Sequence, residues 1–276
     1  MKIFGADFTS APRHAKPITV AEAELRGETL EFVGQQSLSN AQELLDFLNA
    51  PGAWIGAFDF PFGLPRELVT DSHWPQDWVG YVDTIHKMGK AHFENHIRGY
   101  RSQKTGKNRL CRETDKKARS RSPMQLDFIP VGKMFFFGAP ILLRSNCTIV
   151  PFRDGTPNAG IVVEGYPKLV AEEAVGKLRY KSESPSVDSR ILHDIRNSIL
   201  IWLTSHEVLK SYGFKVQIDR AHFNECLSDG KGDKLDALLC TLQAAWAWSR
   251  RSHQYGIPND CDLLEGWIID PAMLAK

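Results

Sequence analysis

The chain has 276 residues, enough for one elaborated domain or two small ones, and its formal net charge is only +1. Hydrophobic residues make up 42% and charged residues 24%, which is the composition of a folded globular protein and not of a disordered one. No stretch approaches the ~20 apolar residues of a membrane-spanning helix, and Asp7 interrupts the N-terminus before a signal-type apolar stretch develops. The five cysteines lack a Cys-x-x-Cys pair, which argues against a disulfide framework, a disulfide-linked partner and a thiolate zinc site. We therefore expect a cytoplasmic protein without membrane contact.

The first 60 residues predict three strands, a helix and a fourth strand. Short apolar or alternating runs indicate the strands, and apolar residues at helical spacing indicate the helix. The expected elements are strands at 2–8, 17–25 and 29–34, a helix at 40–48 with Asn40 as its N-cap, and a strand at 54–60. An antiparallel meander followed by a crossover helix and a parallel strand builds a mixed sheet, so the predicted fold class is α/β.

The middle of the chain, about residues 65–150, is interpreted as an insertion into this sheet. Residues 77–97 look helical, residues 98–122 are expected to form a mobile loop or a helical arm, and residues 132–143 are too apolar to lie exposed. Regular patterns then return, with an expected strand at 160–164, a long helix at 188–212, a strand at 214–218 and a buried helix at 233–251. We interpret residues 1–276 as a single domain elaborated by the inserted segment.

Three acids share one position in the predicted sheet. Asp7, Asp59 and Glu164 each close a short apolar strand. Side chains at the carboxyl ends of adjacent strands meet in one crevice, where three carboxylates repel one another unless a cation lies between them. Mg²⁺ or Mn²⁺ suits such an all-oxygen site. Each acid alone is also explained as a turn or cap residue, so the prediction depends on the coincidence of all three.

A further acidic pair opens the last helix. Asp233 and Asp236 are three residues apart and share one face of the first turn, where the helix dipole stabilises carboxylates. Asp233 is equally explained as the helix N-cap. The residues around Asp236 are predicted to be buried, and a buried acid needs a partner, so Asp236 is the better metal ligand of the two.

Four short stretches resemble the landmarks of domain-of-unknown-function family 429, whose members are regarded as predicted nucleases with an RNase H-like fold. They are residues 4–10, 58–65, 163–167 and 233–238, and they leave the basic middle of the chain uncovered. The resemblance implies a five-stranded mixed sheet whose acidic cluster holds two metal ions. In that arrangement Asp7 bridges the ions, Asp59 and Glu164 add ligands, and the pair Asp233 and Asp236 matches the helix start of Holliday-junction resolvases. The implied activity is two-metal-ion cleavage of phosphodiester bonds, with a catalytic set of Asp7, Asp59, Glu164 and Asp236.

The small net charge conceals a basic segment. Residues 98–121 contain ten Lys or Arg residues against Glu113 and Asp115, a charge of +8, whereas the rest of the chain carries −7. A basic segment on an acidic body indicates contact with a polyanion, here DNA or RNA, without sequence specificity. The predicted nucleic-acid-binding residues are Lys104, Lys107, Arg109, Arg112, Lys116, Lys117, Arg119 and Arg121, together with Lys168. A solvated loop accounts for the same charges equally well.

The sequence leaves two other functions open. In a sugar-kinase or actin-like phosphotransferase, residues 7–10 would form a phosphate-binding turn and Asp59 would be a catalytic acid, but a second glycine-rich phosphate loop is missing. In a non-catalytic nucleic-acid- or partner-binding module, the acids would be structural. His92 and His96 are four residues apart on a predicted helix and form a weaker candidate zinc site.

Overall fold

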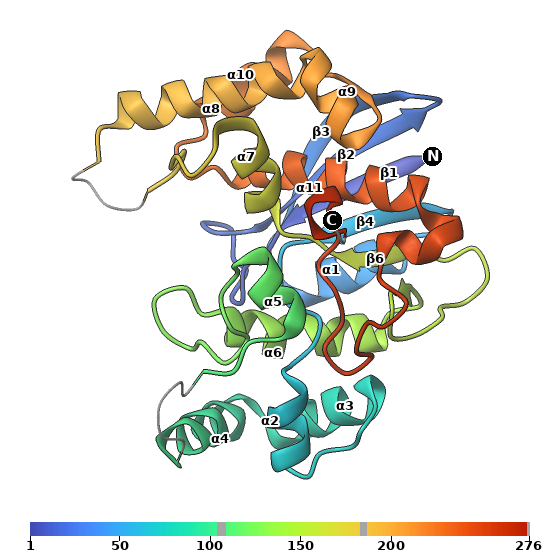
Figure 1. Cartoon of the computed structure of the whole chain (residues 1–276), viewed down its shortest axis with the longest axis vertical. Helices are drawn as coiled ribbons and strands as arrows, with labels where there is room; N and C mark the ends of the chain where they lie inside the picture. The colour runs from blue at the N-terminus through green and yellow to red at the C-terminus, as the bar shows by residue number, and fades with distance from the viewer. Residues whose placement is uncertain (104–108, 183–186, 275–276) are drawn as a thin grey trace.

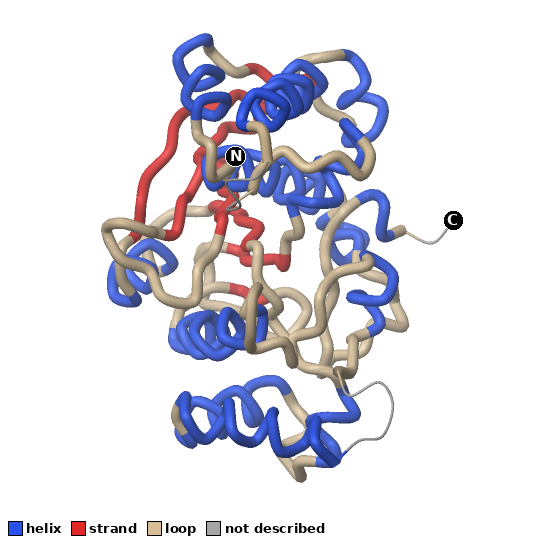
Figure 2. The backbone as a smooth tube through the Cα atoms, turned by 90° about the vertical axis from the view of Figure 1, so that its left-hand side faces the viewer, coloured by secondary structure: helices blue, strands red, loops and turns tan. Residues whose placement is uncertain are grey.

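The core of the molecule is a mixed β-sheet with helices on both faces (Figures 1 and 2). The computed structural model describes residues 1–103, 109–182 and 187–274, and within these ranges the sheet has seven strands in the order β5-β6-β4-β1-β2-β3-β7. An antiparallel meander of β1, β2 and β3 is continued in parallel by β4, β6 and β5 on one side and by β7 on the other. The strands are β1 (Lys2–Asp7), β2 (Ile18–Arg26), β3 (Thr29–Leu38), β4 (Trp54–Phe58), β5 (Thr148–Ile149), β6 (Ile161–Glu164) and β7 (Lys215–Gln217).

The predicted α/β class and the meander followed by a helix and a parallel strand are confirmed. The sheet is larger than the five strands that the resemblance implies, because β5 and β7 add short edge strands. Strand β5 has only two residues, too few to produce the alternation of side chains that predicts a strand. It also lies within the predicted insertion, so that segment contributes one edge of the sheet.

Eleven α-helices surround the sheet in the described part of the chain. Residues of α7–α11 share one buried cluster with one face of the sheet, and residues of α1–α4 and α6 share a second cluster with the other face. The helices are α1 (Ala41–Leu48), α2 (Arg66–Asp71), α3 (Trp78–Met88), α4 (Lys90–Gln103), α5 (Glu113–Ala118), α6 (Val131–Arg144), α7 (Pro167–Val175), α8 (Ser189–Leu203), α9 (His206–Tyr212), α10 (Arg220–Ser228) and α11 (Asp233–Ser249). None of these helices combines the length and the apolar composition needed to cross a membrane. No disulfide joins the cysteines of the described ranges.

Two predicted helices are divided in the structure. Gly89, at a φ of 79°, separates α3 from α4 within the predicted helix 77–97, because this backbone conformation interrupts a helix. The predicted helix 188–212 ends at Leu203, and the Ser205 side chain then caps α9 by accepting a hydrogen bond from the backbone N–H of Glu207. The side chain of Asn40 caps α1 as predicted. His96 shares a hydrogen bond of 2.7 Å with Ser72, and its ring packs in a tilted contact against Trp74, so both contacts account for this histidine without zinc.

Alternation along β1 decides which residues face α11. Ile3 belongs to the buried cluster on the α11 side, whereas Phe4 and Ala6 belong to the cluster on the opposite side. Gly5 lies against α11, and a Cβ atom at this position would approach the carbonyl oxygen of Ala237 to 2.2 Å. The absence of a side chain at Gly5 therefore lets α11 cross the centre of the sheet in close contact with β1, and Asp7 follows on the same side.

Candidate metal centre

Three carboxylates from three elements converge at one end of the sheet. Asp7 ends β1, Asp59 directly follows β4, and Asp236 lies in the first turn of α11. One ligand oxygen from each lies within 4.8 Å of the other two. Ile55 and Ala57 of β4 face the α11 side, so Asp59 continues that alternation and meets Asp236 there. The predicted convergence of Asp7 and Asp59 is therefore present, with Asp236 as their third member.

Burial and mutual repulsion act strongly on this cluster. Burial raises the pKa of Asp7 well above its usual value, and the charge of Asp236 raises it further. Burial, with the charge of Asp236 second, raises the pKa of Asp59 to about 7. In both cases Lys181 offsets part of the shift. When all three carboxylates are ionised, the single ammonium group leaves an excess of two negative charges, which matches the charge of one divalent cation.

Asp236 is held by two residues that the sequence analysis does not single out. The Tyr180 hydroxyl donates a hydrogen bond of 2.5 Å to Oδ1 of Asp236, and the Lys181 ammonium pairs with Oδ2. Asp236 is only 1% exposed, so these contacts satisfy a carboxylate that has little contact with bulk water. Tyr180 and Lys181 follow α7 in a stretch without regular structure, and no spacing in the sequence relates them to a residue 55 positions later.

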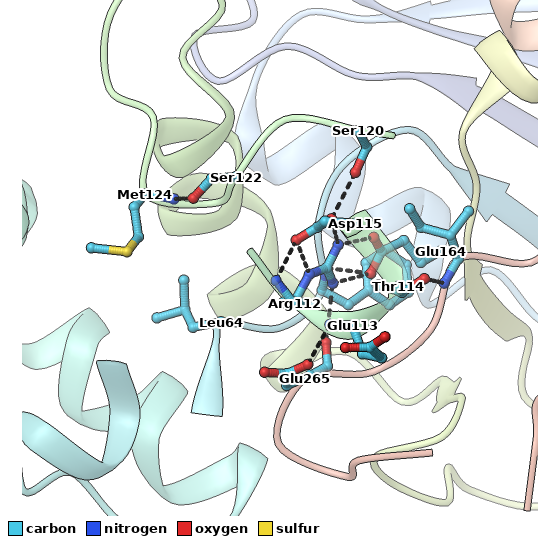
Figure 3. Close-up of polar contacts among 12 residues, drawn as sticks. Leu64, Arg112, Glu113, Thr114, Asp115, Ser120, Ser122, Met124, Glu164 and Glu265 are labelled. Carbon is cyan, nitrogen blue, oxygen red and sulfur yellow. Dashed lines mark hydrogen bonds and ion pairs between the residues drawn. The ribbon is translucent and has the colours of Figure 1, made fainter. Parts of the chain in front are cut away.

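Glu164 does not join the cluster, which corrects the prediction. Its backbone pairs with Phe58 of β4, so its side chain lies on the side of Phe58, opposite to α11. There the carboxylate accepts hydrogen bonds from Arg112 at 2.5 and 2.7 Å and from the backbone N–H of Phe62 at 2.9 Å (Figure 3). The alternation of β6 carries the signal that was missed, since Val163 faces α11 and Glu164 therefore faces away.

Arg112 is a second correction, because it is not an exposed phosphate ligand. It is 1% exposed and lies between the carboxylates of Glu164 and Asp115, with Nη2 2.8 Å from Oδ1 of Asp115 (Figure 3). Its Nη1 also donates to the carbonyl oxygen of Glu265. Counting charges along the sequence places Arg112 in a solvated basic segment. This placement is wrong, because a guanidinium between two buried carboxylates has its hydrogen-bond partners inside the protein.

Asp233 lies beside the cluster and not in it. It is the first residue of α11, and the N-cap of the helix is Gly232 at a φ of 78°, so the alternative interpretation of Asp233 as the N-cap is wrong. Burial raises its pKa, and its charge contributes to the raised pKa of Asp7. Asp233 therefore lies close enough to influence the three carboxylates electrostatically.

A cleft of about 880 Å³ opens above the cluster. Asp59 and Asp236 are among its lining residues, together with the triad of Arg112, Asp115 and Glu164. The other lining residues include apolar side chains, such as Phe60 and Met134, and six basic side chains, which are Arg119, Arg121, Lys168, Lys177, Arg179 and Lys181. Asp59 and Asp236 therefore face a cleft that carries several cations, which concentrate anions near these two acids.

The predicted nucleic-acid-binding residues are divided between the cleft and other places. Arg119, Arg121 and Lys168 line the cleft, and Lys168 also pairs with Glu172 at 3.3 Å. Lys116 pairs with Glu113 at 3.0 Å, Lys117 lies over the Trp267 ring, and neither lines the cleft. Arg109 is exposed and also lies outside the lining, and Lys104 and Lys107 fall outside the described residues. Sequence analysis missed Lys177 and Arg179 because they are separated from the basic segment by more than 50 positions.

No protein-family model matches this chain, and no curated protein or solved structure matches it either.

Proposed function

We propose that the protein is a divalent-metal-dependent hydrolase that cleaves phosphodiester bonds in nucleic acid. The observation that carries this proposal is the convergence of Asp7, Asp59 and Asp236, two of which, Asp59 and Asp236, line a cleft that also carries several basic side chains. Carboxylate oxygens are the ligands that Mg²⁺ and Mn²⁺ prefer, and the excess of two negative charges fits one such ion. The strand order β3-β2-β1-β4-β6 and the resemblance seen in the sequence support an RNase H-like fold for this enzyme.

The acidic and the basic side chains of the cleft have different roles in the proposed reaction. Asp7, Asp59 and Asp236 would hold the metal, which when bound polarises a phosphoryl oxygen and supplies a reactive water. Asp59 must lose its proton before it can act as a ligand, because its pKa is raised to about 7. The basic side chains of the cleft neutralise phosphates on either side of the scissile bond. Hydrolysis by water needs no protein nucleophile.

The two-metal form of this mechanism needs carboxylates beyond the three. Glu164 is unsuited to this role because Arg112 engages both of its oxygens. Asp233 is the remaining candidate, since it lies at the start of α11 and interacts electrostatically with Asp7. In a two-metal reaction, Asp233 and Asp7 would hold the second ion.

The decisive experiment measures cleavage of labelled single-stranded, duplex and branched DNA and RNA in Mn²⁺, Mg²⁺ or EDTA. The main variant is Asp59→Asn, because it removes a ligand and also one of the repelling charges, so the fold should survive. The control is Asp194→Asn, the same change at an exposed residue of α8. We expect metal-dependent cleavage that is lost in Asp59→Asn and kept in Asp194→Asn. Metal-independent cleavage, or full activity in folded Asp59→Asn, would contradict the proposal.

A second candidate function is a nucleic-acid-binding module without catalysis. The observation that favours it is the ion pair of Lys181 with Asp236, which neutralises one acid without a metal. This alternative predicts binding of nucleic acid that is equal in EDTA and in Mg²⁺, with no cleavage in any metal. Hydrolysis of ATP without cleavage of nucleic acid would instead indicate the phosphotransferase that the sequence leaves open.

A further inference from the structure

Apolar side chains are exposed on both sides of the cleft. On one side the connection between α5 and α6 carries Phe128, which is fully exposed, and Ile129, which is 50% exposed and lines the cleft. On the other side the connection that follows α7 carries Leu178, which is 60% exposed and also lines the cleft. Exposed apolar residues beside an acidic centre and several cations indicate a ligand that has both charged and apolar parts.

The backbone at Phe128 is held in place although the side chain is fully exposed. Its φ is 64°, in the left-handed region that aromatic residues rarely adopt. The side chain of Gln125 maintains this turn, because its amide group donates hydrogen bonds to the carbonyl oxygens of Asp127 and Ile129 at 3.2 and 3.0 Å. The buried amide of Gln125 therefore fixes the backbone on both sides of an exposed aromatic ring, which is the arrangement of a preformed contact and not of a loose loop.

The two arginines on the same side of the cleft as Phe128 are anchored through the serine between them. Arg119 and Arg121 flank Ser120, whose hydroxyl donates a hydrogen bond of 2.8 Å to Asp115 (Figure 3). Asp115 is held in turn by Arg112, which also holds Glu164 at the end of β6. The buried triad of Arg112, Asp115 and Glu164 thus ties the basic wall of the cleft to the sheet that positions Asp59.

The cations on the opposite side are anchored to the acidic cluster itself. Lys177 and Arg179 flank Leu178, and the chain then continues directly into Tyr180 and Lys181, which bind Asp236. The carbonyl oxygen of Tyr180 accepts a hydrogen bond of 2.8 Å from Nη1 of the buried Arg196. Each side of the cleft therefore combines two cations with an exposed apolar residue. One side is joined to the buried triad of Arg112, Asp115 and Glu164, and the other is joined to Asp236 of the candidate metal centre.

We infer that the cleft binds an unpaired strand of nucleic acid. Arg119, Arg121, Lys177 and Arg179 contact its phosphates, and its bases stack on Phe128 or pack against Ile129 and Leu178 (Figure 1 shows the α5 and α7 segments that form the two sides). A duplex keeps its bases stacked inside and presents phosphates outward, so it would leave these apolar side chains without a partner. An unpaired strand exposes the faces of its bases, and base stacking on an aromatic ring contributes strongly to such binding.

The size of the cleft agrees with this substrate class. Its volume of about 880 Å³ lies within the range of pockets that enclose a single small ligand, so it holds a few nucleotides at most. This inference rests on the proposed function, since the bound strand would bring a phosphate to Asp59 and Asp236. It concerns binding, however, and is tested without catalysis.

The test is fluorescence anisotropy of the full chain in EDTA, with a labelled 12-nucleotide single strand and the matching duplex, each as DNA and as RNA. The first variant is Phe128→Ala, with Ile201→Ala on α8 as an exposed apolar control away from the cleft. The second is the fourfold Gln variant of Arg119, Arg121, Lys177 and Arg179, with Lys215→Gln as its control. We expect the single strand to bind at least about 10-fold more tightly than the duplex. Phe128→Ala should weaken single-strand binding about 5- to 100-fold, and the fourfold variant should reduce the salt slope by about 2.8, since each phosphate contact contributes ~0.7.

The outcomes separate this inference from the proposed function. Equal or tighter binding of the duplex, an unchanged affinity in Phe128→Ala, or no binding of any polymer would overturn the inference. Tight, Phe128-dependent binding of the single strand supports it whether or not Mn²⁺ then produces cleavage. Preference for DNA or for RNA in these arms identifies the polymer.

Discussion

Gly5 of β1 lies so close to Ala237 of α11 that a Cβ atom on Gly5 would come within 2.2 Å of the Ala237 carbonyl oxygen. This contact sets the distance between the sheet and the helix that carries Asp236. It therefore also sets the distance between Asp7, two residues after Gly5, and Asp236, one residue before Ala237. The geometry of the candidate metal centre depends on a residue that has no side chain.

Gly5→Ala should destabilise the fold and separate the carboxylates. The added methyl group meets backbone atoms that cannot rotate away, so we expect a loss of about 3 kcal/mol in the free energy of unfolding, the upper end for an overpacked core. Urea denaturation measures this free energy of unfolding. Gly99→Ala is the control, because Gly99 lies in helix α4 with open space around its Cβ position, and it should be neutral or stabilising by up to ~1 kcal/mol. Equal stability of the two variants would show that α11 shifts freely against β1.

Arg112→Ala should be far more destabilising than removal of a surface arginine. It would leave Asp115 and Glu164 buried without their cation, which costs about 3–5 kcal/mol. The control is Arg98→Ala, which removes an exposed partner of Glu94 within α4 and should cost less than ~1 kcal/mol. Chemical denaturation of both variants gives the comparison. A small effect at Arg112 would mean that water enters the triad and replaces the guanidinium.

Stability and metal affinity should depend on pH in opposite directions. In the metal-free protein the pKa of Asp59 is raised to about 7, so the folded state holds this proton more tightly than the unfolded state does. The contribution of Asp59 to stability is therefore greatest below the unfolded pKa of about 4 and falls as the pH rises towards 7. Metal binding needs the ionised carboxylate, so affinity for Mg²⁺ or Mn²⁺ should fall as the pH drops below about 7.

Thermal unfolding from pH 4 to 8, in EDTA and in Mg²⁺, checks this pH dependence. Asp59→Asn should flatten the decrease in EDTA and abolish most of the stabilisation by Mg²⁺, whereas Asp194→Asn should leave both curves unchanged. Identical curves with and without Mg²⁺ at pH 8 would mean that the cluster does not bind this ion.

Lys181→Met should strengthen metal binding. Burial lowers the pKa of Lys181, but the charges of Asp236 and Asp7 outweigh it and raise the pKa overall, so the ammonium group stays charged and competes with a metal for these oxygens. Its removal increases the excess negative charge from two to three, and we expect about a 10-fold lower dissociation constant for Mn²⁺, roughly 1.4 kcal/mol. Isothermal titration measures it against Lys215→Met, an exposed control on β7. Weaker Mn²⁺ binding in Lys181→Met would assign Lys181 a supporting role in metal binding instead of a competing one.

Local sequence patterns determine much of this protein. The apolar runs that end at Asp7 and Asp59 predict β1 and β4, and the apolar surroundings of Asp236 predict its burial, because strand and helix periodicity depend on nearby residues. Asp7 and Asp59 could thus be grouped before the fold was known, since strands of one parallel pair end at the same edge of the sheet. The short edge strand β5 and the breaks after Met88 and Leu203 were not predictable in the same way, because they depend on a few residues each.

Only the tertiary structure decided the partners of the charged groups. Glu164 ends a strand just as Asp7 does, yet the register of β6 against β4 turns it to the opposite face, where Arg112 binds it. Arg112 belongs to a basic segment by composition, yet it is buried between two carboxylates. Lys181 pairs with Asp236 across 55 positions. The sequence determines which charges exist and which strands carry them, whereas long-range packing determines which charges meet, because pairing energy depends on burial and on distance in space.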